Sequence, residues 1–175
     1  MKRALLWLPV LAFVGLLAVI ASGLFRPADR TVHSAMIGQP LPAFTLPALV
    51  PGKPGLASSD FGQGRPRLLN IFASWCVPCI TETRVLLRLK AAGVPIEGVA
   101  VRDTGAALQR FLADNGDAYD RIGSDPDSHV QLSLGSSGVP ETFVIDGKGR
   151  ILLQHVSDIR DEDVPAILAA IRRAQ

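Results

Sequence analysis

The chain starts with a long apolar stretch and continues with segments in which apolar and polar residues alternate. Residues 4–25 contain no charged side chain and follow Lys2 and Arg3. As a helix they would extend about 33 Å, which matches a bilayer core and exceeds the apolar core of a cleaved signal peptide. We therefore predict an uncleaved membrane anchor at residues 1–25. Arg26 and Arg30 balance Lys2 and Arg3, so charge alone leaves its orientation open.

The remainder of the chain divides into a short tether and one domain. Residues 26–36 are polar and lack periodicity, as is typical of a tether. Residues 37–175 form one domain that is large enough to fold without help from a disulfide. The Pro/Gly-rich residues 47–64 predict a surface excursion before the core begins. A net charge of only +2 without a basic cluster excludes the usual electrostatic basis for binding nucleic acid.

Periodicity predicts an α/β domain. The predicted strands are residues 68–72, 96–101, 142–145 and 150–156, and the predicted helices are residues 80–92, 106–113, 128–134 and a final helix with Val164, Ile167, Leu168 and Ile171 on one face. The first two strands should be parallel, because a helix connects them. The sequence Asp146-Gly147-Lys148-Gly149 predicts an antiparallel hairpin between the last two.

The chain has two cysteines, and both lie in Trp75-Cys76-Val77-Pro78-Cys79 between a strand and a helix. Free backbone N–H groups at a helix N-terminus stabilise a thiolate, so Cys76 is the predicted nucleophile. Cys79 lies three residues on, on nearly the same helix face, and could resolve a mixed disulfide. The spacing therefore predicts a dithiol/disulfide couple.

Other uses of this spacing are weaker. A zinc site needs two further ligands, whereas His33, His129 and His155 are scattered along the chain. Haem attachment needs a histidine at position 80, which is Ile80. A structural staple would gain little, because a short loop yields about 2 kcal/mol against about 4.7 for a hundred-residue loop.

The order of strand, C-x-x-C helix, crossover, proline loop, hairpin and final helix resembles a thioredoxin-like fold over about residues 37–173. Three segments, residues 38–44, 69–76 and Gly138-Val139-Pro140-Glu141-Thr142-Phe143, resemble the membrane-tethered DsbE/CcmG proteins. This resemblance implies a thiol:disulfide oxidoreductase on the periplasmic side of the bacterial inner membrane. It also implies that the protein keeps the haem-binding cysteines of apocytochrome c reduced during cytochrome c biogenesis.

The resemblance also implies roles for residues around the cysteines. Pro140 matches a cis proline beside the pair and, with Val139 and Trp75, would shape the substrate groove. Trp75 would form the rim next to an exposed nucleophile.

The same resemblance assigns redox tuning to Pro78, Glu82 and Glu141. Asn70 stands where thioredoxin has a buried aspartate that assists proton transfer, and Glu82 or Glu141 could replace it. An ionised carboxylate about 8 Å from the thiolate would cost roughly 2 kcal/mol and favour an electron-donating couple. If Glu82 instead lies on an exposed surface, solvent would screen most of this effect.

The sequence has no nicotinamide or flavin fingerprint, so we expect no bound cofactor other than the Cys76–Cys79 couple. The resemblance implies a membrane thiol transporter of the DsbD/CcdA kind as electron donor. Three alternatives remain: a general extracytoplasmic reductase of the ResA/TlpA kind, a redox-inactive module that binds apocytochrome, and a disulfide-introducing oxidase.

Overall fold

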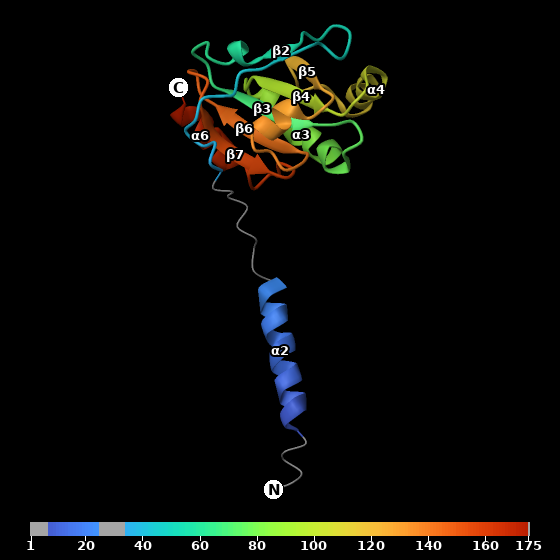
Figure 1. The fold of residues 1–175 in the computed structure, drawn as a ribbon, viewed down its shortest axis with the longest axis vertical. Helices are drawn as coiled ribbons and strands as arrows, with labels where there is room; N and C mark the ends of the chain where they lie inside the picture. The colour runs from blue at the N-terminus through green and yellow to red at the C-terminus, as the bar shows by residue number, and fades with distance from the viewer. Residues whose placement is uncertain (1–6, 25–33, 175) are drawn as a thin grey trace. The chain divides into compact units, whose positions relative to one another are not determined.

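The computed structural model describes residues 7–24 and 34–174, and the chain divides into two compact units, residues 1–30 and 31–175. The first unit contains helix α2 (Leu8–Leu24), drawn in blue in Figure 1. None of the helices in the described part of the chain has the length and apolarity needed to cross a membrane. The predicted anchor at residues 1–25 and the tether at residues 26–36 lie partly outside the described residues.

The second unit is built on a five-stranded mixed sheet in the order β5-β4-β3-β6-β7. Strand β3 (Arg67–Phe72) pairs in parallel with β4 (Ile96–Val101), which pairs in parallel with β5 (Arg121–Asp125). On its other side β3 pairs antiparallel with β6 (Glu141–Ile145), which forms a hairpin with β7 (Ile151–Val156). The predicted parallel pair and hairpin are both confirmed, and the sheet is the one that the thioredoxin resemblance implies.

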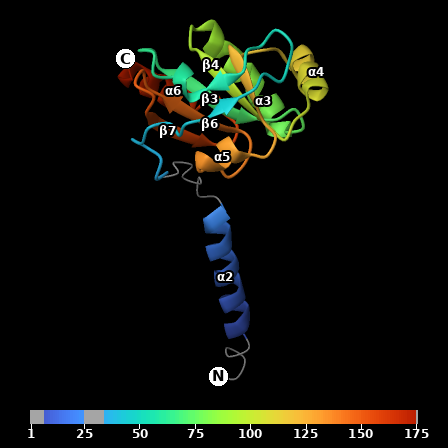
Figure 2. The same cartoon turned by 45° about the horizontal axis from the view of Figure 1, so that its top comes forward.

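Three helices pack on one face of this sheet. The connections from β3 to β4 and from β4 to β5 run in the same direction, so right-handed crossovers place α3 (Val77–Ala91) and α4 (Gly105–Asn115) on the same face. Helix α6 (Val164–Arg173) contacts β6 and β7 and lines a shallow apolar groove together with α3. Figure 2 shows α6 beside β6 and α4 near α3. Short helix α5 (His129–Ser133) follows β5.

The opposite face is covered by strands β1 (Thr45–Leu46) and β2 (Leu56–Ala57) and the 3-10 turn η1 (Ser58–Asp60). The interpretation of residues 47–64 as a surface excursion is therefore wrong. Leu56 and Phe61 each expose only 1% of their surface, because they pack against the sheet. The turn-forming residues around these two apolar side chains concealed their contribution to the core.

Strand β5 was not predicted, because Arg121, Gly123 and Asp125 give it a weak strand pattern. Gly123 has a specific reason to be there. A Cβ at this position would lie 2.6 Å from the Cβ of Leu46 and 3.0 Å from that of Leu56. Glycine thus allows β1 and β2 to approach the sheet closely.

The first described residues of the second unit bind both edges of the sheet. The amide of Gly38 donates to the Ile151 carbonyl over 2.7 Å, at the start of β7. At the other edge, the Ser124 amide donates to Pro47 over 2.9 Å and the Ile122 amide donates to Pro54 over 3.1 Å. The segment from residue 38 to residue 54 therefore joins β7 to β5.

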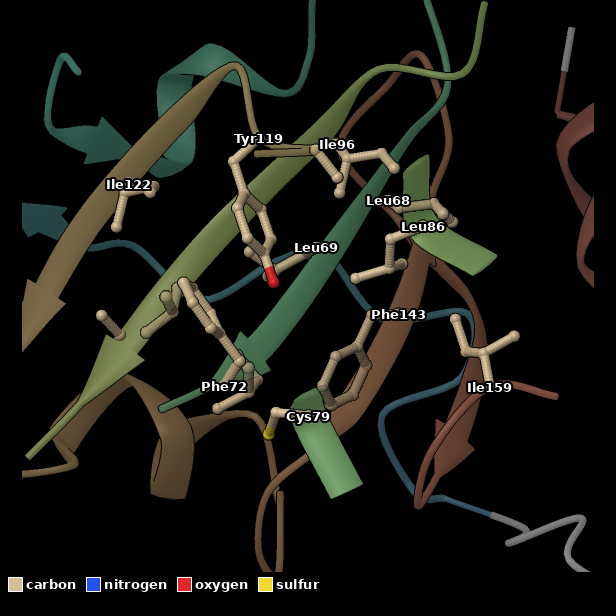
Figure 3. Close-up of a cluster of buried hydrophobic side chains, with 14 of the residues drawn as sticks. Leu68, Leu69, Phe72, Cys79, Leu86, Ile96, Tyr119, Ile122, Phe143 and Ile159 are labelled. Atoms are coloured by element: carbon tan, nitrogen blue, oxygen red, sulfur yellow. The ribbon is translucent and has the colours of Figure 1, made fainter. Parts of the chain in front are cut away.

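The hydrophobic core extends to the cysteines on the face of β3 that α3 covers. Figure 3 shows Phe72, Tyr119 and Cys79 in one buried cluster. The rings of Phe72 and Tyr119 are stacked with their centroids 4.4 Å apart. Since residues two apart on a strand share a face, Asn70 points to the same side as Phe72 and lies beneath α3.

Candidate active site

The two cysteines lie at the junction between the end of β3 and the start of α3, and they form a disulfide. Cys76 is the N-cap of α3, with its Cα 5.3 Å from that of Cys79. The Cys79 amide donates to the Cys76 sulfur over 3.2 Å. Pro78 occupies the first turn and has no N–H, so it removes one of the donors that could face this sulfur. The position predicted for Cys76, at a helix N-terminus, is confirmed.

The surface around the disulfide is apolar and exposed, whereas the sulfurs are not. Trp75, Val77 and Ile80 expose 58%, 72% and 43% of their surfaces, but Cys76 exposes 4% and Cys79 only 2%. The prediction of an exposed nucleophile is wrong for this oxidised structure, because the Cys76 sulfur is turned toward the sulfur and amide of Cys79. The exposed surface at the disulfide is therefore formed by these apolar side chains.

Three hydrogen bonds fix the loop that carries Trp75. The Trp75 indole N–H donates to the carbonyl of Arg102 over 3.2 Å. One residue earlier, the amide and hydroxyl of Ser74 donate to the two carboxylate oxygens of Asp103 over 2.6 and 2.7 Å. Neither Asp103 nor Arg102 was singled out in the sequence, because both follow a different strand, β4.

The proline loop lies beside the same strand end. The Val139–Pro140 peptide bond is cis, as the resemblance implies. Ile71 of β3 is paired with Glu141, so Pro140 lies at the level of Phe72, just before the loop that contains the cysteines. Val139 and Trp75 line one cavity of about 410 Å³. Pro140 is the next residue after Val139, but it is buried and does not line this cavity. The structure thus brings two of the three predicted groove residues, Trp75 and Val139, to one cavity.

Glu82 is buried beneath the disulfide, one helical turn after Cys79. Its side chain is 1% exposed, so the alternative of a solvent-screened surface carboxylate is wrong. One carboxylate oxygen accepts the Asn70 amide N–H over 2.9 Å, and the other accepts the Ile159 backbone N–H over 3.1 Å. Burial raises the pKa of Glu82 to about 7, although these two hydrogen bonds oppose the rise. A carboxyl with this pKa can give and take a proton near neutral pH.

Asn70 connects Glu82 to the core. Besides the bond to Glu82, its amide N–H donates to the Thr142 hydroxyl over 2.9 Å, and its carbonyl accepts the Tyr119 hydroxyl over 2.8 Å. Burial holds the pKa of Tyr119 well above its usual value, so the phenol stays protonated and keeps donating. Asn70 is thus an uncharged group whose hydrogen bonds hold Glu82 in place.

Glu141 is the second predicted tuning acid, and it is also buried, with 1% of its surface exposed. Its carboxylate accepts the Ser137 backbone N–H over 3.1 Å and the side-chain amide of Gln154. These contacts join the proline loop to β7. The structure therefore places Glu141 behind the loop and Glu82 beneath the cysteines.

A buried C-x-x-C disulfide at a helix N-terminus, next to a cis-proline loop on a thioredoxin-like sheet, defines a thiol:disulfide oxidoreductase. Within the described residues there is no cluster of three His, Cys, Asp or Glu side chains that could hold a metal ion.

Comparisons with known proteins agree with this class. The sequence matches the Redoxin family over residues 36–171. The thiol:disulfide interchange protein HelX of Rhodobacter capsulatus is 36% identical over 162 residues, covering 93% of this chain and 92% of the relative. DsbE of Escherichia coli K12 is 35% identical over 165 residues, covering 91% and 88%. The chain belongs to the DsbE/CcmG family of thiol:disulfide interchange proteins.

Solved structures show the same fold. A secreted thiol-disulfide isomerase from Corynebacterium glutamicum superposes with a TM-score of 0.61 at 29% identity, covering 75% of this chain and 85% of that one. A DsbF homologue from Corynebacterium diphtheriae superposes with a TM-score of 0.66, covering 83% and 96%. At 22% identity, the second likeness concerns the fold alone.

Proposed function

We propose that this protein is a disulfide reductase of cytochrome c biogenesis, which reduces the cysteines of apocytochrome c or of its chaperone. The observation that carries this proposal is the buried Glu82 carboxyl, one turn from Cys79, with a pKa raised to about 7. The family resemblance supports the client, because DsbE/CcmG proteins act in that pathway.

In the proposed reaction, the Cys76 thiolate attacks one sulfur of a client disulfide, and the first client cysteine leaves as a thiolate that takes up a proton. Cys79 then passes its proton to the Glu82 carboxylate and attacks the Cys76 sulfur. The second client cysteine leaves and is protonated. Two electrons have moved from the protein's dithiol to the client, and the Cys76–Cys79 disulfide seen here is the product.

The surroundings of Cys76 support the proposed direction of electron flow. Pro78 withholds one N–H donor, and the charged form of Glu82 repels a thiolate, so the thiolate is less stabilised than in a strongly oxidising relative. A less stable dithiolate makes the protein a better electron donor. Glu141, behind the proline loop, would act in the same sense.

The proposed partner that restores the dithiol is a membrane thiol transporter of the DsbD/CcdA kind. We propose that the domain of residues 37–175 works in the periplasm, held at the bacterial inner membrane by residues 1–25 and a tether at residues 26–36.

An export-dependent reporter fused after the tether should be active. An inactive reporter would contradict this location and, with it, the proposed clients.

The deciding experiment is haem staining of membranes from cells that lack this protein, with and without a small added thiol. We expect covalent cytochrome c to be lost and the thiol to restore it. Normal staining would instead favour a general reductase of the ResA/TlpA kind.

A variant with both Cys76→Ser and Cys79→Ser should fail to complement these cells. If it complements, the domain is a redox-inactive module that binds apocytochrome.

The reduction potential tests the third alternative. A value of about −120 mV, instead of thioredoxin's value of about −270 mV, would point to an oxidase.

A further inference from the structure

The cavity beside Trp75 has walls of mixed polarity, with three serines and Gln131 among them, and one charged side chain. Trp75, Val139 and Leu132 supply apolar surface, and Leu132 is 64% exposed. Among the described residues that line it, Arg102 alone is charged. We call this cavity the Arg102 groove.

Arg102 is held in position from several sides. Its backbone N–H donates to the Asp125 carbonyl over 3.2 Å, and its own carbonyl accepts the Trp75 indole N–H. Its side-chain Nε donates over 3.0 Å to the hydroxyl of Ser128, which is 1% exposed. Both Arg102 and Ser128 have a left-handed backbone, with φ of 48° and 58°. Such conformations are uncommon for residues other than glycine and persist only where the surroundings enforce them.

The nearby acids are engaged elsewhere. The Asp125 carboxylate accepts the Gln131 backbone N–H over 3.0 Å, and Asp103 accepts from Ser74 and Thr104. Arg102 forms no ion pair with any acid in the described part of the chain, and its terminal guanidinium nitrogens have no hydrogen-bond acceptor there. A fixed guanidinium with free N–H groups suits a carboxylate.

We propose that the Arg102 groove receives an acidic side chain of the client polypeptide, close in sequence to the cysteine that Cys76 attacks. This inference rests on the proposed reductase function and names the client feature that the site selects. Trp75 is the residue before Cys76, and Val139 precedes the cis proline, so a chain bound at the disulfide passes along this groove. A glutamate fits best, because its methylene groups would lie on Trp75 and Leu132 while its carboxylate meets Arg102.

The test uses disulfide peptides that are identical except for Glu or Gln at one of the two positions on either side of the reactive cysteine. At low salt, we expect the protein to reduce at least one Glu peptide about fivefold faster than its Gln partner, since a partly exposed ion pair contributes about 1 kcal/mol. The preference should shrink toward twofold at high salt. No position with more than a twofold preference would overturn the proposal.

Arg102→Gln should abolish the preference, and Arg102→Lys should retain part of it, because lysine keeps the charge without the planar fork. Arg110→Gln is the matched control. It removes the same charge from α4, outside the Arg102 groove, and should leave the preference intact. A preference that persists in Arg102→Gln would overturn the assignment.

Two further measurements separate this inference from the proposed function. Reduction of the uncharged 2-hydroxyethyl disulfide by the unmodified protein tests the reductase proposal by itself, and no reduction would mean that this proposal fails. Binding of the same peptides with serine in place of cysteine, followed by NMR titration, needs no redox activity. Equal affinities for the Glu and Gln forms would overturn the groove assignment by itself.

Discussion

The two sides of the disulfide differ in polarity and in burial. Beneath it, Asn70 and Glu82 form a buried, fully hydrogen-bonded polar network with Tyr119 and Thr142. Around its outer side, Trp75 and its neighbours form an exposed apolar rim. The buried side has what proton transfer requires, and the outer side has what contact with a client chain requires. Substitutions in the buried network should therefore change the rate of reduction of every disulfide substrate alike. Substitutions on the exposed rim should change the rate for large polypeptide substrates only.

The largest effect should come from the sulfurs that both sides share. Cys76→Ser should abolish disulfide reduction, because no nucleophile remains. Cys79→Ser should stop the reaction at the mixed disulfide, which non-reducing electrophoresis would show as a covalent adduct with the client. An adduct through Cys79 in the Cys76→Ser variant, formed at a similar rate, would reverse the assigned roles.

Next, Glu82→Gln should lower the rate of reduction by about 10²-fold at pH 7 for peptide and small disulfides alike, since a general acid–base group is lost. The inflection near pH 7 in the rate profile should disappear with it. Glu97→Gln is the control: Glu97 is a buried acid with a raised pKa, but it pairs with Arg67 on the opposite face of the sheet. If both variants altered the pH profile equally, the effect could not be assigned to the position of Glu82 near the cysteines.

Glu82 should also affect stability. Its pKa is about 7 in the folded protein against 4.5 for the free group, so the folded state holds this proton more tightly. The free energy of unfolding should then fall as the pH rises from about 4.5 to 7, by on the order of 3 kcal/mol. Glu82→Gln should lack this fall. Denaturant unfolding of the oxidised proteins between pH 5 and pH 8 measures it, and parallel curves would refute it.

The smallest effect should come from the rim. Trp75→Ala should lower kcat/KM for a peptide disulfide by about five- to tenfold, because a large exposed aromatic is a strong contact for a partner. Reduction of 2-hydroxyethyl disulfide should change by less than twofold. A similar loss with both substrates would mean that Trp75 shapes the cysteines themselves, and the division between the two sides would not hold.

The sequence predicts the parts of the site that are close together in the chain. The pair Cys76 and Cys79, the helix N-terminus and the hairpin at Asp146 were predictable, because each depends on local spacing. The final helix was predictable from its apolar face. The cis bond at Pro140 came from the family resemblance, since the residues alone also fit an ordinary turn.

The parts that depend on distant residues were not predictable. The burial of Glu82 depends on Ile159, which is 77 positions away and supplies the N–H that one carboxylate oxygen accepts. Tyr119 reaches Asn70 from 49 positions away, so no local pattern marks it. The residues of β5 have little preference for a strand by themselves. The strand forms because β5 pairs with β4 and because Gly123 leaves space for the Leu46 side chain.

The segment that joins β7 to β5 has a consequence for how this protein behaves in a crowded compartment. The amides of Ile122 and Ser124, on the outer side of the border strand β5, are already bonded to Pro54 and Pro47. A foreign strand therefore finds no unpaired amides at these positions and cannot extend the sheet there. These two bonded amides protect the border strand against strand-to-strand aggregation.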